Sequence, residues 1–410
     1  MLDSRNRTRT IAHLLKYVSP VDLWEFLGDF SLFLYDLDMT GAWRAERLTG
    51  ENWRRTVERL SQAYPALPRS SSLRPVHSLS AKAAAEILED LCASPATLHE
   101  NTAAVFREAL RQVAAARGSR DFLTPAPLAE LMADMLRPGR EERVLDPACG
   151  SGGLLAACAA RCGGSRFCGV EIHPTFAAVA CFHLHFRGVA DPAISVGDFF
   201  AAADQMADTF DVVLANPPYS GDLQQTVRFL TAIAAVLKPG GRCGVLVPEG
   251  LLSNTASSLV VDFKRELLGS HTLDAVVSLP KKIYKPYTES KSSLVLLRKG
   301  RADPRPVFYA ELPEFTGAEK EFSPSVYRND MARIAAAWRR YAEDLSYRDP
   351  LFWPVTGEEL ERRGYDLSFT PSAPAAYPAG GGCEERWRAR LMRRQEALGQ
   401  LLQDYVEGKP

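Results

Sequence analysis

Two kinds of hydrophobic pattern divide this chain. Residues 1 to about 118 carry apolar side chains at helical spacing, which predicts a helical region interrupted by a loop near residues 65–72. From about residue 119 to 312, short β-branched runs alternate with helical stretches and glycine turns, as in βαβ units around a mostly parallel sheet. We therefore expect an α/β core. Its seven predicted strands span residues 143–146, 167–171, 193–196, 211–215, 243–248, 274–279 and 293–298.

The strand pattern stops after about residue 312, so we expect residues 313–410 to form a helical region and tail. Residues 331–345 have the spacing of an amphipathic helix, and residues 370–382 form a Pro/Ala/Gly-rich linker. The segment 383–406 is predicted to be a charged helix with an apolar stripe. Such a stripe needs a covering surface, which is either the parent domain or another subunit.

Composition limits the function classes. The 410 residues are 46% apolar, enough for two or three domains, and the formal net charge is only −1. Polyanion binding must therefore depend on local basic patches, such as the row Arg107, Arg111, Arg117 and Arg120, which is otherwise a solvated face. No apolar leader or membrane-spanning window of about 18 residues is evident, so we expect a cytoplasmic protein without a membrane partner.

The eight cysteines are spread along the chain, several of them inside apolar patterns, and are predicted to be reduced thiols. Two groups invite a metal interpretation: Cys158 with Cys162 and Cys168, and Cys181 with two following histidines. Neither has the paired spacing of a structural zinc site. We expect core thiols, helix-surface histidines at His183 and His185, and no metal.

Residues 210–219, FDVVLANPPY, form the most informative stretch. A buried strand ends at Asn216, because Pro217 and Pro218 cannot continue a sheet ladder. The carboxyl end of a strand in an open α/β sheet is where ligands bind. The Asn216 amide oxygen and the Pro217 carbonyl can each accept a hydrogen from an amino group, while Tyr219 stacks on the base that carries it.

Three acids lie at the ends of three consecutive predicted strand regions. Asp146 precedes a glycine-rich turn, Glu171 ends the next strand, where a carboxylate can accept both hydroxyls of a ribose, and Asp198 can accept from an adenine amino group. The turn reads DPACGSGG rather than GxGxxG. Because Asp146 can hold an ammonium, which a dinucleotide lacks, the pattern predicts S-adenosyl-L-methionine as cofactor.

These residues resemble the γ-class N6-adenine DNA methyltransferases, and among them the modification subunit of type I restriction-modification systems. The match runs from about residue 117 to 299 through FLTP, DPACGSGG, GVEIHP, GDFF, NPPY and KPGGRCGVLVPEGLL, and GYDLS at residues 364–368 looks like a further family element. The NPPY box also occurs in enzymes that methylate glutamine or RNA bases, and the FLTP segment before the DPACGSGG turn favours DNA as the substrate. The resemblance implies a Rossmann-like, seven-stranded methyltransferase core at residues 119–312, after a helical domain at 1–118.

The resemblance also implies the site residues. The catalytic set is Asn216, Pro217, Pro218 and Tyr219, where this branch usually has Phe in place of Tyr. Thr124 is expected to cap a helix with Pro125 at its first position, and Phe122 to pack on the methionyl end of the cofactor. The cofactor-binding set is Asp121, Phe122, Leu123, Thr124, Pro125, Asp146, Pro147, Cys149, Gly150, Ser151, Gly152, Gly153, Glu171, Ile172, Asp198 and Phe199.

The implied substrate is double-stranded DNA with an adenine flipped out of the helix. The catalytic region has no obvious target-recognition domain, so a separate specificity subunit is expected to dock on the terminal helices, with a second methylase copy and a restriction subunit as further partners. Lys281, Lys282, Lys285 and Lys291 are candidates for phosphate contacts or form a solvated loop. Two alternatives stay open: an RNA or protein methyltransferase that shares the NPPY box, and a non-catalytic scaffold.

Overall fold

The computed structural model describes residues 124–218, 222–285, 288–300, 305–315 and 323–368. The helical N-terminal region, the linker and the terminal helix expected from the sequence lie outside these residues. Within the described part, no helix combines the length and the apolar character that a membrane span needs.

A nine-stranded mixed sheet forms the centre, with strand order β3-β2-β1-β4-β5-β7-β6-β8-β9. The first five strands in this order are parallel, β7 is antiparallel to β5 and to β6, β8 is parallel to β6, and β9 is antiparallel to β8. The strands are β1 (Arg143–Asp146), β2 (Arg166–Glu171), β3 (Ala193–Val196), β4 (Phe210–Ala215), β5 (Leu237–Pro248), β6 (His271–Ser278), β7 (Ser292–Lys299), β8 (Val307–Glu311) and β9 (Phe352–Val355).

All seven predicted strands are present, and six of them lie within three residues of the expected bounds, whereas β5 begins at Leu237 rather than at residue 243. The expected total of seven is wrong. β8 was not predicted, and β9 lies beyond residue 312, where strand signals were expected to stop. β9 is a four-residue edge strand that contains Pro354, and proline is tolerated in a sheet mainly at such an edge. The domain boundary at residue 312 stays a prediction, although β9 joins the same sheet.

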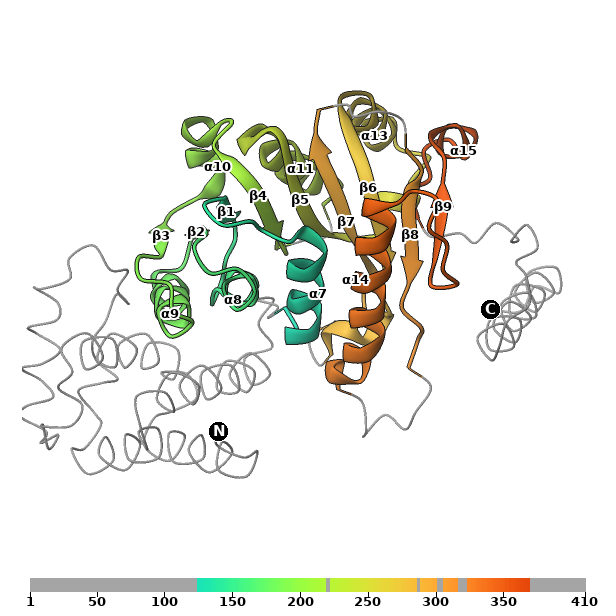
Figure 1. Cartoon of the computed structure of the whole chain (residues 1–410). Helices are drawn as coiled ribbons and strands as arrows, with labels where there is room; N and C mark the ends of the chain where they lie inside the picture. Colours follow the sequence, from blue (N-terminus) through green and yellow to red (C-terminus); the bar gives the residue numbers. More distant parts are fainter. Residues whose placement is uncertain (1–123, 219–221, 286–287, 301–304, 316–322, 369–410) are drawn as a thin grey trace, which may run out of the picture.

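Helices cover both faces of the sheet, so that two apolar cores lie on either side of it (Figure 1). On one face pack α7 (Ala126–Leu136), α8 (Gly153–Ala159), α9 (Pro174–His185) and α14 (Arg328–Glu343). On the other pack α10 (Phe199–Ala202), α11 (Leu223–Val236), α12 (Glu249–Ser253), α13 (Ser258–Ser270) and α15 (Gly357–Arg362). Short 3₁₀ turns span Ala203–Met206, Lys281–Tyr284 and Pro324–Tyr327. The predicted amphipathic helix at 331–345 corresponds to α14.

The helix α14 braces α7 against the sheet. The Trp338 indole Nε1 donates to the Met135 carbonyl at 2.8 Å, and Arg328 forms an ion pair with Glu130. The C-terminal end of α7 is held from β5, because the Arg242 Nε donates to the Leu136 carbonyl at 2.7 Å. α7 is thus held in its middle and at its C-terminal end.

Candidate functional site

The strands that carry the predicted site residues are neighbours. β3, β2, β1 and β4 are adjacent and parallel, so their carboxyl ends meet at one edge of the sheet. Asp146 is the last residue of β1, Glu171 is the last residue of β2, and Asn216 directly follows β4. The structure therefore brings the predicted cofactor turn and the predicted acceptor loop to the same edge.

The turn after β1 is held by carboxylates. The Glu171 Oε2 accepts from the Gly150 amide at 2.8 Å, and its Oε1 accepts from the His173 amide at 2.9 Å. The Asp146 Oδ1 accepts from the Ala148 amide at 3.2 Å. Asp146 is only 1% exposed, and this burial raises the pKa of its carboxyl to about 8. A buried carboxyl of this kind is suited to a cationic ligand group.

Two glycines allow the turn to pack closely, and only one of them was predicted. Gly152 has φ 77°, and a Cβ there would lie 3.0 Å from the Ala180 Cα of α9. Gly169, inside β2, was missed: a Cβ there would lie 2.8 Å from the Cys149 sulfur and 2.7 Å from Ile194. A glycine in the middle of a strand is the sequence signal that could have indicated this close approach.

The expectation of a helix-surface histidine at position 183 is wrong. His183 is buried on α9, and its Nδ1 lies 3.1 Å from the Ser151 carbonyl oxygen of the glycine turn. The reason is that α9 packs under the turn, so this face of the helix points inward. The described residues contain no cluster of three or more His, Cys, Asp or Glu side chains arranged to hold a metal.

An apolar surface is exposed beside the turn. Ile172, directly after Glu171, is 63% exposed, and Val196, at the end of β3, is 44% exposed. Glu171 and Val196 are paired in the sheet register, so these apolar groups come from adjacent strand ends. Asp198 is the N-cap of α10, and its Oδ1 accepts from the Phe200 amide at 2.9 Å. An apolar surface flanked by carboxylates suits a nucleoside.

The acceptor loop is joined to the FLTP segment. The Asn216 Nδ2 donates to the Thr124 Oγ1 at 3.0 Å, although 92 residues separate the two positions. Pro217 is buried and Pro218 is exposed. Tyr219, Asp121, Phe122 and Leu123 lie outside the described residues, so their predicted roles stay predictions.

The predicted cap of α7 by Thr124 is wrong. Pro125 is the N-cap residue, its carbonyl accepts from the Leu128 and Ala129 amides at 2.9 and 3.0 Å, and no side chain caps the helix. Pro125 is therefore not the first helical residue; that position belongs to Ala126. The Thr124 hydroxyl is thereby available to accept from Asn216.

A second polar group at this edge was not predicted. Glu249 begins α12 after β5, the neighbour of β4, and its Oε2 accepts from the Ser293 hydroxyl at 2.8 Å. The Lys291 Nζ lies 3.7 Å from the Glu249 Oε1, and the Lys285 Nζ lies 2.9 Å from the Glu289 Oε1. Two of the four lysines proposed for phosphate contacts thus already have carboxylate partners.

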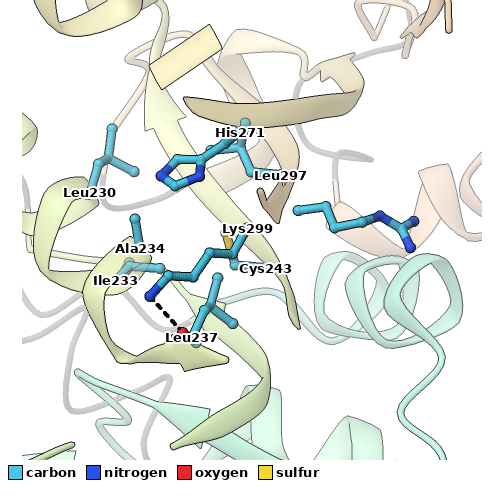
Figure 2. A pocket seen from close by; sticks show the side chains of 9 residues that line it. Leu230, Ile233, Ala234, Leu237, Cys243, His271, Leu297 and Lys299 are labelled. Carbon is cyan, nitrogen blue, oxygen red and sulfur yellow. Dashed lines mark hydrogen bonds between the residues drawn. The ribbon is translucent and has the colours of Figure 1, made fainter. Parts of the chain in front are cut away.

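A shallow apolar hollow lies at the opposite edge of the sheet (Figure 2). Its lining includes Leu237 at the start of β5, His271 at the start of β6 and Lys299 at the end of the antiparallel β7. The Lys299 ammonium donates to the Leu237 carbonyl at 2.7 Å, as Figure 2 shows. Because these residues lie at the amino ends of the parallel strands, the hollow is separate from the candidate site.

Comparison with solved structures supports the fold. A chain from a structure on complex assembly and conformational transition of a type I R-M system is 22% identical, with a TM-score of 0.67 over 99% of this chain and 98% of that chain. The methyltransferase subunit of a type I restriction-modification system from Streptococcus thermophilus is 17% identical, with a TM-score of 0.62 over 89% of this chain and 97% of that chain. The predicted Rossmann-like methyltransferase fold is confirmed, with nine strands.

Sequence comparison identifies the family. The methylase subunit of the type I restriction enzyme EcoEI from Escherichia coli is 23% identical over 64% of this chain, and the match spans 60% of that subunit. The chain thus covers less than two thirds of this relative. The profile of the N-6 DNA methylase family matches residues 101–229 and 223–375, more than half of the sequence. This match confirms the resemblance and, at the level of the family, the predicted S-adenosylmethionine cofactor. The chain belongs to the N-6 DNA methylase family.

Proposed function

We propose that this protein transfers a methyl group from S-adenosylmethionine to N6 of adenine in double-stranded DNA, as the modification subunit of a type I-like restriction-modification system. One observation carries the proposal. Asn216 stands at the end of β4 with its Nδ2 held by Thr124, on the sheet edge that also carries the Asp146 and Glu171 turn. The Asn216 amide, which can accept hydrogen bonds from a target amine, and the turn suited to a nucleoside thus share one edge of the sheet.

The turn fits the cofactor by its donor set and its open space. Nothing lies within 4 Å of a Cβ built on Gly150 or Gly153, so a ligand can approach the backbone there. In this proposal Asp146 holds the ammonium, Glu171 accepts from the ribose hydroxyls, and Asp198 accepts from the adenine amino group, with Ile172 against the adenine ring. The other cofactor-binding residues follow from the family resemblance.

The acceptor loop positions the target amine. A target adenine is rotated out of the duplex, because its amino group is inaccessible within the base stack. The Asn216 Oδ1 and the Pro217 carbonyl accept its two amino hydrogens, which draws the nitrogen toward tetrahedral geometry, and Tyr219 stacks on the base. When bound, S-adenosylmethionine supplies a methyl group on a positively charged sulfur, so no strong general base is needed. The catalytic gain is positioning.

Sequence choice is proposed to come from a separate specificity subunit, with a second methylase copy and a restriction subunit as further partners. The support is the likeness to type I methylase subunits and the compact catalytic region. Efficient methylation of one defined DNA sequence by the isolated chain would contradict this part.

The decisive experiment follows labelled methyl groups from S-adenosylmethionine into DNA, RNA and protein, using the full chain alone and with its cognate specificity subunit. We expect label in DNA, as N6-methyladenine. Asn216→Ala should lower the transfer rate by at least about 100-fold, because an acceptor made at the reacting nitrogen is lost. Asn329→Ala, on the exposed face of α14, is the matched control and should leave the rate unchanged.

Measurements of cofactor binding distinguish the role of Asn216 from that of Glu171. Asn216→Ala should bind S-adenosylmethionine with unchanged affinity by calorimetry, whereas Glu171→Ala should bind it at least about tenfold more weakly, since the ribose acceptor and the support of Gly150 are both lost. Label in RNA or protein alone, or full activity of Asn216→Ala, would reject the proposed reaction. Unchanged affinity of Glu171→Ala would reject its ribose role.

A further inference from the structure

The hydrogen bond between Asn216 and Thr124 has a direction. The Thr124 Oγ1 accepts from the Asn216 Nδ2 at 3.0 Å. An asparagine amide has a donating NH₂ on one side and an accepting oxygen on the other, so fixing the NH₂ also fixes the oxygen. With Nδ2 engaged by Thr124, the Oδ1 is directed away from Thr124.

Thr124 adjoins a helix that is anchored by several contacts. It precedes Pro125, the N-cap of α7, and Asp134 of α7 forms an ion pair with Arg161, which follows α8. α14 holds the same helix through the bond from Trp338 to Met135, and β5 holds its C-terminal end through Arg242. Asn216, by contrast, begins a loop between β4 and α11. The bond therefore ties the loop to a fixed reference.

We propose that Thr124 is a positioning residue, whose hydroxyl accepts from Nδ2 and so holds the Asn216 amide in the orientation that presents Oδ1 to the target amine. This inference depends on the proposed function. The opposite orientation would present NH₂ donors to an amino group that itself donates, so the ground-state hydrogen bond would be replaced by repulsion. The role differs from direct contact with the cofactor, which the family resemblance implies for the same residue.

The side chain at position 124 offers a graded test. Thr124→Val keeps the shape and removes the hydroxyl, whereas Thr124→Ser keeps the hydroxyl. Thr231→Val is the matched control, because its hydroxyl donates only to the Val227 carbonyl on the exposed side of α11. Each variant is assembled with the partners that support DNA methylation, and its melting temperature is recorded.

Single-turnover transfer is measured at saturating cofactor and DNA. Thr124→Val should lower the rate by about tenfold or more, since misorienting a group at the reacting centre costs at least about one factor of ten, and Thr124→Ser should restore it. The dissociation constant of S-adenosylmethionine should stay within about twofold, because the carboxylates of the turn are intact. An unchanged rate at saturation, with or without weaker cofactor binding, would overturn the inference.

A second measurement does not depend on activity. The chain has six asparagines, so labelling them with ¹⁵N gives few side-chain NH₂ signals, and the Asn216 pair is assigned by its loss in Asn216→Ala. In the full chain we expect this pair to shift and to exchange faster with water in Thr124→Val, and to stay in place in Thr124→Ser. An unmoved pair in Thr124→Val would overturn the inference. If wild type labels no DNA while the pair still shifts, the proposed function fails and the orienting contact stands.

Discussion

The buried carboxyl groups in the two halves of the sheet differ in their partners. In the parallel half, β3-β2-β1-β4-β5, Asp146 is buried with a single hydrogen bond from Ala148 among the described residues, and Ile172 stands 63% exposed. In the half that contains the antiparallel pairings, β7-β6-β8-β9, the buried Asp274 is paired with both Arg298 and Arg305. Under the proposed function, the Asp146 carboxyl and the Ile172 side chain are left for contacts with the cofactor, whereas the Asp274 carboxyl is satisfied by two arginines of the protein.

The same contrast holds for the apolar groups. Phe308 of β8 and Phe352 of β9 stack with ring centroids 4.5 Å apart, and Trp338 and Tyr341 of α14 surround Phe308. This aromatic cluster closes the far end of the sheet and holds α14 over α7. β8 and β9, the strands beyond the expected seven, thus support α14, which packs on the helix that follows Thr124.

The largest stability effect is expected at Lys264, which sequence reasoning missed. This α13 residue is 1% exposed, and its ammonium donates to the Leu252 carbonyl at 3.0 Å and to the Asn254 carbonyl at 2.8 Å. The Leu252 carbonyl also accepts from the Leu367 amide of the GYDLS element. Lys264→Met should lower the free energy of unfolding by about 2–4 kcal/mol, because two buried carbonyls lose a charged donor.

Denaturant unfolding measures the Lys264 effect. Glu266→Gln, two positions further along α13, is the control; its side chain is exposed, so we expect a loss below about 1 kcal/mol. Hydrogen exchange of the Leu367 amide should also accelerate in Lys264→Met. A stability equal to that of Glu266→Gln would contradict the predicted role of the Lys264 ammonium.

Replacing Asp146 is expected to raise the stability of the protein, whereas replacing Lys264 lowers it. The folded pKa of Asp146, about 8, lies above the ordinary value of 3.8, so the folded state binds more protons between these pH values than the unfolded state. The stabilisation that this group contributes is fully present below about pH 4 and is lost as the pH rises to about 8. Asp146→Asn should therefore stabilise the cofactor-free protein at pH 8 by about 1–2 kcal/mol, since a neutral amide replaces a buried charge.

Melting curves from pH 4.5 to 8.5, at intervals of about half a unit, compare the two proteins across the window in which the carboxyl titrates. The difference in stability between Asp146→Asn and wild type should grow with pH, while cofactor binding weakens in the variant because the ammonium partner is lost. A difference that is constant with pH would mean that Asp146 is ionised in the folded state. Asp146 would then not be a buried neutral carboxyl in the cofactor-free protein.

The sequence predicted the core well because its signals are local. β1 and β3 have the expected bounds, since a short run with β-branched residues that Asp or Gly ends is typical of a strand, whether buried as in β1 or mostly exposed as in β3. The strand stop at Asn216 followed from the two prolines. β9 was missed because FWPV is short, contains proline and gains stability only by pairing with β8 and stacking on Phe308.

The parts of the site that sequence could not predict depend on distant contacts. Thr124 has the local signature of a helix cap, and only the position of Asn216, 92 residues away, gives its hydroxyl another partner. Lys264 occupies a helix position that is ordinarily solvated, and its burial follows from the end of α12 and the GYDLS element folding over it. Such roles arise from tertiary packing, which hydrophobic periodicity does not predict because it reflects only neighbouring positions in the sequence.

The smallest effect concerns a place where the second half of the sheet reaches the edge of the candidate site. β6 runs in the same direction as β5, so the short helix at Lys281–Tyr284 after it lies at the edge that carries Asn216. The Lys281 side chain is exposed there, whereas Lys285 is paired with Glu289, so we expect Lys281 to make the stronger phosphate contact.

Lys281→Gln should weaken DNA binding about twofold and reduce the slope of log affinity against log salt by about 1 unit. Lys285→Gln, the matched variant, should weaken DNA binding less, since a phosphate must compete there with a carboxylate. Equal losses from both variants would mean that the ion pair between Lys285 and Glu289 opens on DNA binding. No loss from either variant would mean that this part of the sheet makes no phosphate contact.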